Sequence, residues 1–348
     1  MFTTQFYQEL VRTHRYAEIG AECIDYALPN ISRAELARRW LCHDGGQRFA
    51  EVAMHAPELC AITTGIGLSG PPHAGTVSQI MRALFLQRAG CYVQFVLGDL
   101  DAYNGKKRRL GEVRLLARKY SRFLAALGFD DRRGRLRDQF DALDVLRTMC
   151  LAAQHITDEM CEGAEEDLHA VYVACEKVDA TMTFRRKVSL ALMTADFIDL
   201  AREGYRQVLV TLGVDEHRYV RFAQRVSHAL GRELPAYQVE IAAMYSPMIV
   251  GFNGHPKMSK SFPGSGIDLE MEADEIRERI VESPDTATGP LDCPVVQMLL
   301  ALSSIDDKQL ATAIAARSYD ASQWRLWKLQ LADEVIEMGR IWKECSDV

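Results

Sequence analysis

The chain has 348 residues, 48% of them hydrophobic and 26% charged, with a formal net charge of −7 at neutral pH. That length supports a large catalytic domain with a smaller one, and the acidic balance argues against a general nucleic-acid binder. The first residues lack the basic and apolar regions of a signal peptide, and no apolar stretch is long enough for a membrane span. Nine cysteines without a C-x-x-C pair are typical of reduced thiols in a cytoplasmic protein and predict no metal site.

Residues 1–57 are predicted to form a helical N-terminal appendage. Apolar residues recur at helical spacing, for example Leu10 and Val11, and Ser32 to Glu35 have the spacing of a capping box. No motif in this part points to a chemistry, so it receives no functional assignment.

A buried strand and a glycine-rich turn are predicted at residues 59–76. The apolar run ends at Gly65 and Gly67, and a helical pattern begins after Gly75. Backbone N–H groups at such a helix start point at an anion, as in the phosphate sites of doubly wound folds. His73 inside the turn adds a side-chain donor, whereas the alternative is a purely structural histidine.

A second strand is predicted at residues 93–100 and ends near Asp99 and Asp101. A basic segment follows it. Residues 104–137 hold twelve Lys and Arg against three acids. This segment is either a solvated helix face or a patch for RNA phosphates, for which we select Lys106, Lys107, Arg108 and Arg109. Helices are expected from 109 to 127 and from about 138 to 161, within a helical insertion spanning about 130–187.

A mostly apolar helix at 188–200 carries Asp196, and a buried strand at 207–215 ends on Gly213 and Asp215. Apolar neighbours favour Asp196 as a buried acceptor for a substrate N–H or O–H over a helix-surface aspartate, while Met193 beside it could equally be core packing. Alternating strands and helices predict an α/β fold, with a Rossmann-like parallel sheet in a catalytic domain over residues 58–265.

The most informative stretch is the loop at residues 255–265, which contains Lys257 and Lys260. Two lysines three apart, followed by Pro and Gly, predict a polar loop that brings two ammonium groups onto one anion. Such a loop suits nucleotidyl chemistry, in which negative charge grows in the transition state; the alternative is a solvated lysine loop.

Residues 266–348 hold 8 basic against 17 acidic residues and predict an acidic helical C-terminal domain, with helices near 272–283, 294–303, 307–317 and 321–344.

The lysine loop, with K-M-S-K-S at 257–261, resembles one signature of the class I aminoacyl-tRNA synthetases, and H-A-G-T at 73–76 resembles the other. Residues 59–283 resemble the tryptophanyl/tyrosyl subclass. The resemblance implies ATP-dependent formation of an aminoacyl adenylate with Mg²⁺, transfer to the acceptor end of tRNA, and a cytoplasmic homodimer. It implies that the catalytic residues are His73, Lys257 and Lys260, that ATP is bound by Gly65, Ser69, Gly70, Gly75, Thr76, Gly213, Asp215, Met248, Ile249, Met258 and Ser259, and that the amino acid is bound by Ser189, Met193, Asp196 and Glu216.

Within the subclass, M-T-A-D at 193–196 resembles the M-A-A-D of bacterial tryptophanyl enzymes, so Met193 favours tryptophan over tyrosine. The sequence departs from the subclass at Glu216, where a glutamine is usual, at Thr76, which replaces the last histidine of the signature, and in its short acidic C-terminal part. Two alternatives stay open: a synthetase paralogue that serves a non-standard acceptor or a dedicated pathway, and a regulatory binding protein that keeps the fold without turnover.

Overall fold

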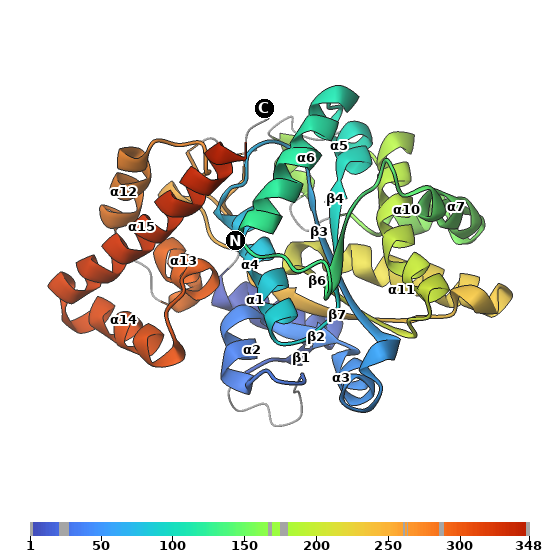
Figure 1. Cartoon of the computed structure of the whole chain (residues 1–348), viewed down its shortest axis with the longest axis horizontal. Helices are drawn as coiled ribbons and strands as arrows, with labels where there is room; N and C mark the ends of the chain where they lie inside the picture. Colours follow the sequence, from blue (N-terminus) through green and yellow to red (C-terminus); the bar gives the residue numbers. More distant parts are fainter. Residues whose placement is uncertain are drawn as a thin grey trace.

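A mixed sheet forms the centre of the molecule in this computed structural model, which describes residues 3–20, 28–165, 169–174, 180–259, 262, 264–284 and 289–345 (Figure 1). Its strands are β1 (Ala17–Glu18), β2 (Cys42–Asp44), β3 (Cys60–Gly67), β4 (Val93–Gly98), β5 (Gly134–Asp138), β6 (Gln207–Gly213) and β7 (Glu240–Ser246). The spatial order is β1-β2-β7-β6-β3-β4-β5, and β3 to β7 run parallel. The predicted Rossmann-like α/β fold is thereby confirmed.

The strand order places a topological switch point at the centre of the sheet. From β3 the chain continues outward through β4 and β5, then returns to add β6 and β7 on the other side of β3. The connections after β3 and β6 therefore leave in opposite directions, and doubly wound folds bind their ligands in a crevice at the carboxyl ends of the strands at such a switch point. The segments around His73 and Asp215 follow these two strands.

Helices cover both faces of the sheet. They are α1 (Thr4–His14), α2 (Arg33–Arg39), α3 (Gly46–His55), α4 (Ala74–Arg88), α5 (Asp99–Lys106), α6 (Leu110–Ala126), α7 (Leu143–Ala152), α8 (Asp158–Glu162), α9 (His169–Ala174), α10 (Phe184–Ile198), α11 (His217–Glu233), α12 (Ala273–Val281), α13 (Pro294–Leu302), α14 (Asp307–Tyr319) and α15 (Ala321–Glu344). None of them, within the described ranges, is long and apolar enough to cross a membrane.

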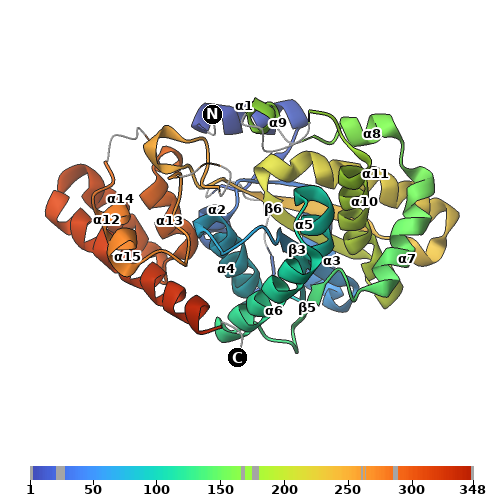
Figure 2. The ribbon, with the colours of Figure 1, turned by 90° about the horizontal axis from the view of Figure 1, so that it is seen from above.

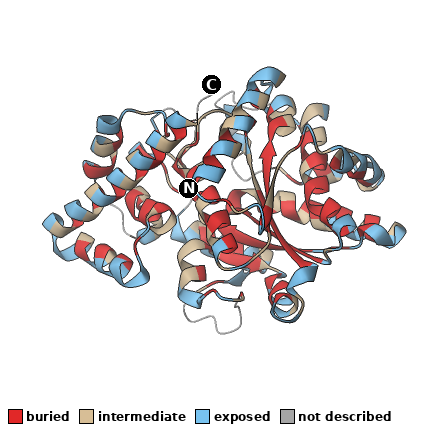
Figure 3. Cartoon of the chain, viewed as in Figure 1, coloured by how far each residue is buried: buried red, intermediate tan, exposed pale blue. Residues whose placement is uncertain are grey.

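The central strands are buried on both faces (Figure 3). Successive residues of β6 alternate between two cores: Leu209 joins one with α4 and α6, whereas Val208 and Val210 join the other with α10 and α11. This double burial explains why the strand is a continuous apolar run.

The four C-terminal helices α12–α15 match the predicted helical segments closely and lie to one side of the sheet (Figure 1). The buried Trp342 of α15 packs against the rings of Tyr120 and Phe123 on α6, with centroids 4.8 and 5.4 Å apart. This aromatic contact docks the acidic part onto the catalytic part.

The expectations for two other regions need correction. Residues 1–57 contain helices, but also β1 and β2, which extend the sheet antiparallel to β7, with Cys42 opposite Tyr245. These strands are too short to give a periodic signal, and they cover an edge that would otherwise be unpaired. The insertion expected over 130–187 begins with β5, an alternating R-L-R strand, and β7 was not predicted.

Candidate active site

His73 lies at the start of α4, beside the crevice at the switch point. It is the N-cap residue of the helix, and its Nδ1 accepts a hydrogen bond of 3.1 Å from the backbone N–H of Gly75. A Cβ at position 75 would lie 2.8 Å from Cε1 of the imidazole. Glycine at this position therefore allows the His73 ring to fold over the first turn of α4, with Thr76 half-buried next to it.

Two glycines shape the segment before His73, one at a close approach to β4 and one at a positive φ. A Cβ at Gly65 would lie 2.7 Å from the carbonyl oxygen of Val96 in β4, so the strand pair needs glycine there. Gly70 has a φ of 144°, and its carbonyl accepts a hydrogen bond of 3.0 Å from the Tyr120 hydroxyl. The carbonyl of Ser69 accepts a hydrogen bond from the Arg108 guanidinium.

The segment 265–269 joins the two signature segments. The N–H of Ala74 donates to the carbonyl of Ile267, and the N–H of Leu269 donates to that of Pro72, both at 2.9 Å. At the other end, the Ser265 hydroxyl bridges the N–H and the carbonyl of Ser259, each at 3.0 Å. One short stretch of backbone therefore positions the lysine loop against the start of α4.

Lys257 reaches the end of β6. Its Nζ lies 2.5 Å from Oδ2 of Asp215, a buried carboxylate, and a Cβ at Gly213 would meet Oδ1 of the same aspartate at 2.6 Å. The ammonium thus neutralises the group that the resemblance assigns to ATP binding. Lys260, the other predicted lysine, lies outside the described residues.

The predicted ATP-binding residues Met248 and Ile249 lie in a segment tied to two distant helices. The Met248 N–H donates to the Tyr7 hydroxyl of α1 at 3.0 Å, and Nε2 of Gln297 on α13 donates to the Met248 carbonyl at 2.6 Å. The Ile249 carbonyl accepts the N–H of the buried Met258 at 2.9 Å. The sequence carried no signal for these long-range ties.

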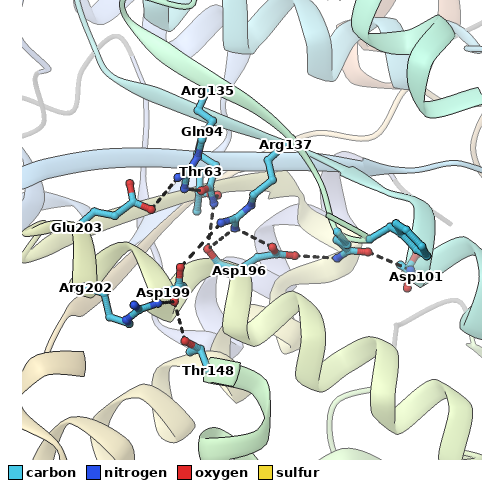
Figure 4. Close-up of polar contacts among 12 residues, drawn as sticks. Thr63, Gln94, Asp101, Arg135, Arg137, Thr148, Asp196, Asp199, Arg202 and Glu203 are labelled. Carbon is cyan, nitrogen blue, oxygen red and sulfur yellow. Dashed lines mark hydrogen bonds and ion pairs between the residues drawn. The ribbon is translucent and has the colours of Figure 1, made fainter. Parts of the chain in front are cut away.

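Asp196 is only 1% exposed, so it is not a helix-surface aspartate. Its Oδ1 lies 2.8 Å from Nη2 of Arg137, and its Oδ2 accepts a hydrogen bond of 2.7 Å from Nε2 of Gln139 (Figure 4). Burial raises the pKa of Asp196 to about 6, although Arg137 and Gln139 both pull it down. Protein donors thus already hold both oxygens, and the role of Asp196 towards a ligand stays a prediction.

A network of buried polar groups extends from Asp196 along the sheet (Figure 4). Gln94 donates to the Asp196 carbonyl at 2.9 Å and to the Thr63 hydroxyl at 3.1 Å, while Gln139 accepts the Asp101 N–H at 3.0 Å. Sequence reasoning missed Gln94, Arg137 and Gln139. The alternation of polar and apolar residues in β5 was the available signal, but Arg135 and Arg137 were interpreted only as part of the basic segment.

Of the other predicted amino-acid-binding residues, Ser189 is connected to this network through Asp101. The Ser189 hydroxyl donates to the Asp101 carbonyl at 3.5 Å, and Met193 is half-buried against the core. Glu216 is the N-cap residue of α11 and is half-buried. The structure brings Ser189, Met193 and Asp196 onto α10, and Glu216 to the end of β6.

The basic segment 104–137 is partly neutralised in the folded chain. Arg114 lies 2.7 to 3.1 Å from carboxylate oxygens of Asp99, Asp138 and Asp141, and Arg135 lies 2.8 Å from Glu203. The four residues at 106–109 are exposed at the end of α5. These ion pairs involve Arg114 and Arg135, and whether the exposed residues 106–109 contact RNA stays a prediction.

The parallel sheet, the glycine-containing turn at the start of α4 and the segment that joins it to the lysine loop are arranged on the α/β fold of the class I synthetases. A family model described as tRNA synthetases class I (W and Y) matches residues 190–285. The tryptophan–tRNA ligase of Pyrobaculum aerophilum is 25% identical over 225 residues, 64% of this chain and 56% of the relative. The tyrosine–tRNA ligase of Methanopyrus kandleri is 29% identical over 224 residues, 62% of each chain.

Solved structures show the same fold. The tryptophanyl-tRNA synthetase of Aeropyrum pernix has a TM-score of 0.73 at 19% identity and covers 99% of this chain and 97% of its own. The tyrosyl-tRNA synthetase of Archaeoglobus fulgidus, complexed with L-tyrosine, has a TM-score of 0.69 at 16% identity and covers 90% and 98%. The comparisons bear out the resemblance predicted from the two signatures: the chain is similar to class I aminoacyl-tRNA synthetases of the tryptophanyl and tyrosyl subclass. They match both members of the subclass and do not separate them.

Proposed function

We propose that this chain activates an amino acid with ATP as an aminoacyl adenylate and transfers it to tRNA. The observation that supports the proposal is the backbone link through residues 265–269, which connects Ser259 of the lysine loop to Pro72 and Ala74 on either side of His73. A fold alone would not carry it, because related folds host many activities.

The proposed reaction is attack of the amino-acid carboxylate on the α-phosphorus of ATP, with pyrophosphate as the leaving group. In this proposal His73 meets the phosphates from one side, and the loop lysines meet them from the other. When the ribose hydroxyls bind Asp215, Lys257 exchanges this carboxylate for a phosphate. Among the described residues no group of three His, Cys, Asp or Glu could hold a metal, so Mg²⁺ would be held chiefly by the phosphates.

Tryptophan is the amino acid that we favour, with tyrosine as the alternative. Met193 and Asp196 both lie on α10, where Met193 is half-buried and Asp196 is a buried acceptor. Each oxygen of Asp196 has a lone pair beyond its bond to Arg137 or Gln139, so a ring N–H or O–H can still be accepted.

The proposed partners are the acceptor end of tRNA and a second copy of the chain, in the cytoplasm, where charging takes place. The alternative is a paralogue that passes the activated amino acid to a non-standard acceptor or a dedicated pathway. The acidic composition of residues 266–348 favours this alternative, since these residues offer little positive charge to an anticodon arm.

The test is amino-acid-dependent ATP–pyrophosphate exchange with each of the twenty amino acids, followed by charging of total tRNA. We expect exchange with tryptophan above all others, and charging of a tRNA. Exchange without charging would select the paralogue, and the absence of exchange with every amino acid would overturn the proposal. In the same assay the variant Lys260→Ala should lower the exchange rate. Lys308→Ala, at an exposed lysine on α14, is its matched control.

A further inference from the structure

Helix α11 carries a row of arginines that the sequence analysis did not single out. At 100° per residue, Arg218, Arg221, Arg225 and Arg232 fall within a stripe about 60° wide. The opposite side of the helix is core, with Val220, Ala223 and Val226 fully buried. The stripe extends for about 21 Å along the helix axis, given its rise per residue.

A pocket of about 490 Å³ lies on the first half of this stripe. It is lined by His14, Gly163, Arg218, Arg221, Gln224 and Arg225. The lining side chains include three guanidinium groups, so positive charge is concentrated in this pocket. A positive concave surface of this kind fits an anion better than an apolar or a cationic ligand.

The Arg221 side chain, which lines this pocket, is held in place by contacts with two residues. Arg221 donates to the His14 carbonyl at 3.2 Å and lies 5.3 Å from the centre of the Tyr16 ring. Within the described ranges, the Asp44 carboxylate contacts two of the lining side chains: its Oδ2 lies 3.8 Å from Nε of Arg221 and 3.3 Å from Nε2 of Gln224. Asp44 offsets only part of the charge, and Arg225 and Arg232 are exposed to solvent.

The position of the stripe connects it to the catalytic crevice. Helix α11 starts at His217, two residues after Asp215, and its first turn meets the end of α1 in the upper part of Figure 2. A chain of phosphates held along Arg218 to Arg232 would therefore reach the crevice at one end. Arg12 and Arg15 at the end of α1 are exposed and add positive charge beside the pocket.

We infer that this surface binds the phosphate backbone of an RNA, and within the proposed function, on which the inference rests, that the RNA is the tRNA whose acceptor end enters the crevice. Arginine suits this role because its planar fork meets two phosphate oxygens at once. The row also supplies several phosphate contacts in sequence, unlike a site for one small anion.

The test compares tRNA binding by wild type and R218Q/R225Q/R232Q, which leaves Arg221 in place because of its contacts with His14 and Tyr16. The matched control is R48Q/R88Q/R325Q, at three exposed arginines on other surfaces. Binding is measured by fluorescence anisotropy of labelled total tRNA from about 50 to about 200 mM salt. Amino-acid-dependent exchange and sedimentation of the same proteins report the activation site and the oligomeric state.

The expected result is a loss of tRNA affinity of about tenfold or more at the lowest salt, with a salt slope reduced by about 2 to 3. Exchange, oligomeric state and the control triple variant should match wild type. An unchanged affinity and slope overturn the inference, as does absence of tRNA binding by wild type at low salt. A changed oligomeric state overturns it in favour of a subunit contact. Absence of exchange in wild type counts against the proposed function only, because the RNA measurement still decides this surface.

Discussion

Replacing Arg137 by methionine tests whether the buried network is a coupled ion pair. The substitution keeps the aliphatic bulk but removes the guanidinium 2.8 Å from Oδ1 of Asp196, whose side chain is 2% exposed. Removing one member of a buried pair typically costs about 3 to 5 kcal/mol, because the other charge is left without compensation. We expect a loss of this size in the free energy of unfolding of R137M near pH 8.

The pH dependence follows from the raised pKa of Asp196. In wild type this pKa is about 6, against 3.8 for an ordinary aspartate, so ionised Asp196 costs the folded state about 3 kcal/mol. Its stabilising contribution is therefore largest below pH 3.8 and is lost as the pH rises through 6. Removing Arg137 raises the pKa further, so R137M should lose less stability near pH 5, where Asp196 already carries a proton.

The assay is urea unfolding followed by circular dichroism, at both pH values, for wild type, R137M, D196N and the double variant. The double variant should lose at least about 2 kcal/mol less than the sum of the single ones, since neither charge is left alone. Arg48→Met, at an exposed arginine paired with Glu51, is the control and should cost less than about 1 kcal/mol. Additivity within about 0.5 kcal/mol would refute the coupling.

Three further predictions concern activity. His73→Ala and Lys260→Ala should each lower the exchange rate by about 10²-fold or more while leaving the unfolding midpoint near that of wild type, and wild-type exchange in either would sink the site assignment. Gly75→Ala should lower exchange although alanine favours helix, because its Cβ would displace the His73 ring; unaltered exchange would mean that the ring position is unimportant. Alanine at all four positions 106–109 should weaken tRNA charging but not exchange, and equal loss of both would indicate a folding defect instead.

Much of the protein was predictable from the sequence because the signals were local. Each of the two signatures lies within one short stretch of sequence. A phosphate-binding turn needs its glycines and histidine within one loop, and the two lysines lie together in a second loop. The C-terminal helices followed from periodicity over ten or more residues, and the buried parallel strands from short apolar runs. These features depend on neighbours within a few residues, and α12–α15 lie near their predicted positions.

What only the tertiary structure decided were pairings between distant residues. Arg137 and Asp196 are 59 residues apart, and nothing in either local sequence shows that one neutralises the other. The same holds for β1 and β2 on the edge of β7, and for the carboxylates that neutralise Arg114. The net charge of a segment is the sum of the charges of its residues. The electrostatic potential at a surface depends instead on which charged groups lie next to each other in the folded chain. The arginines of α11 became a positive surface because their helix buries its other side.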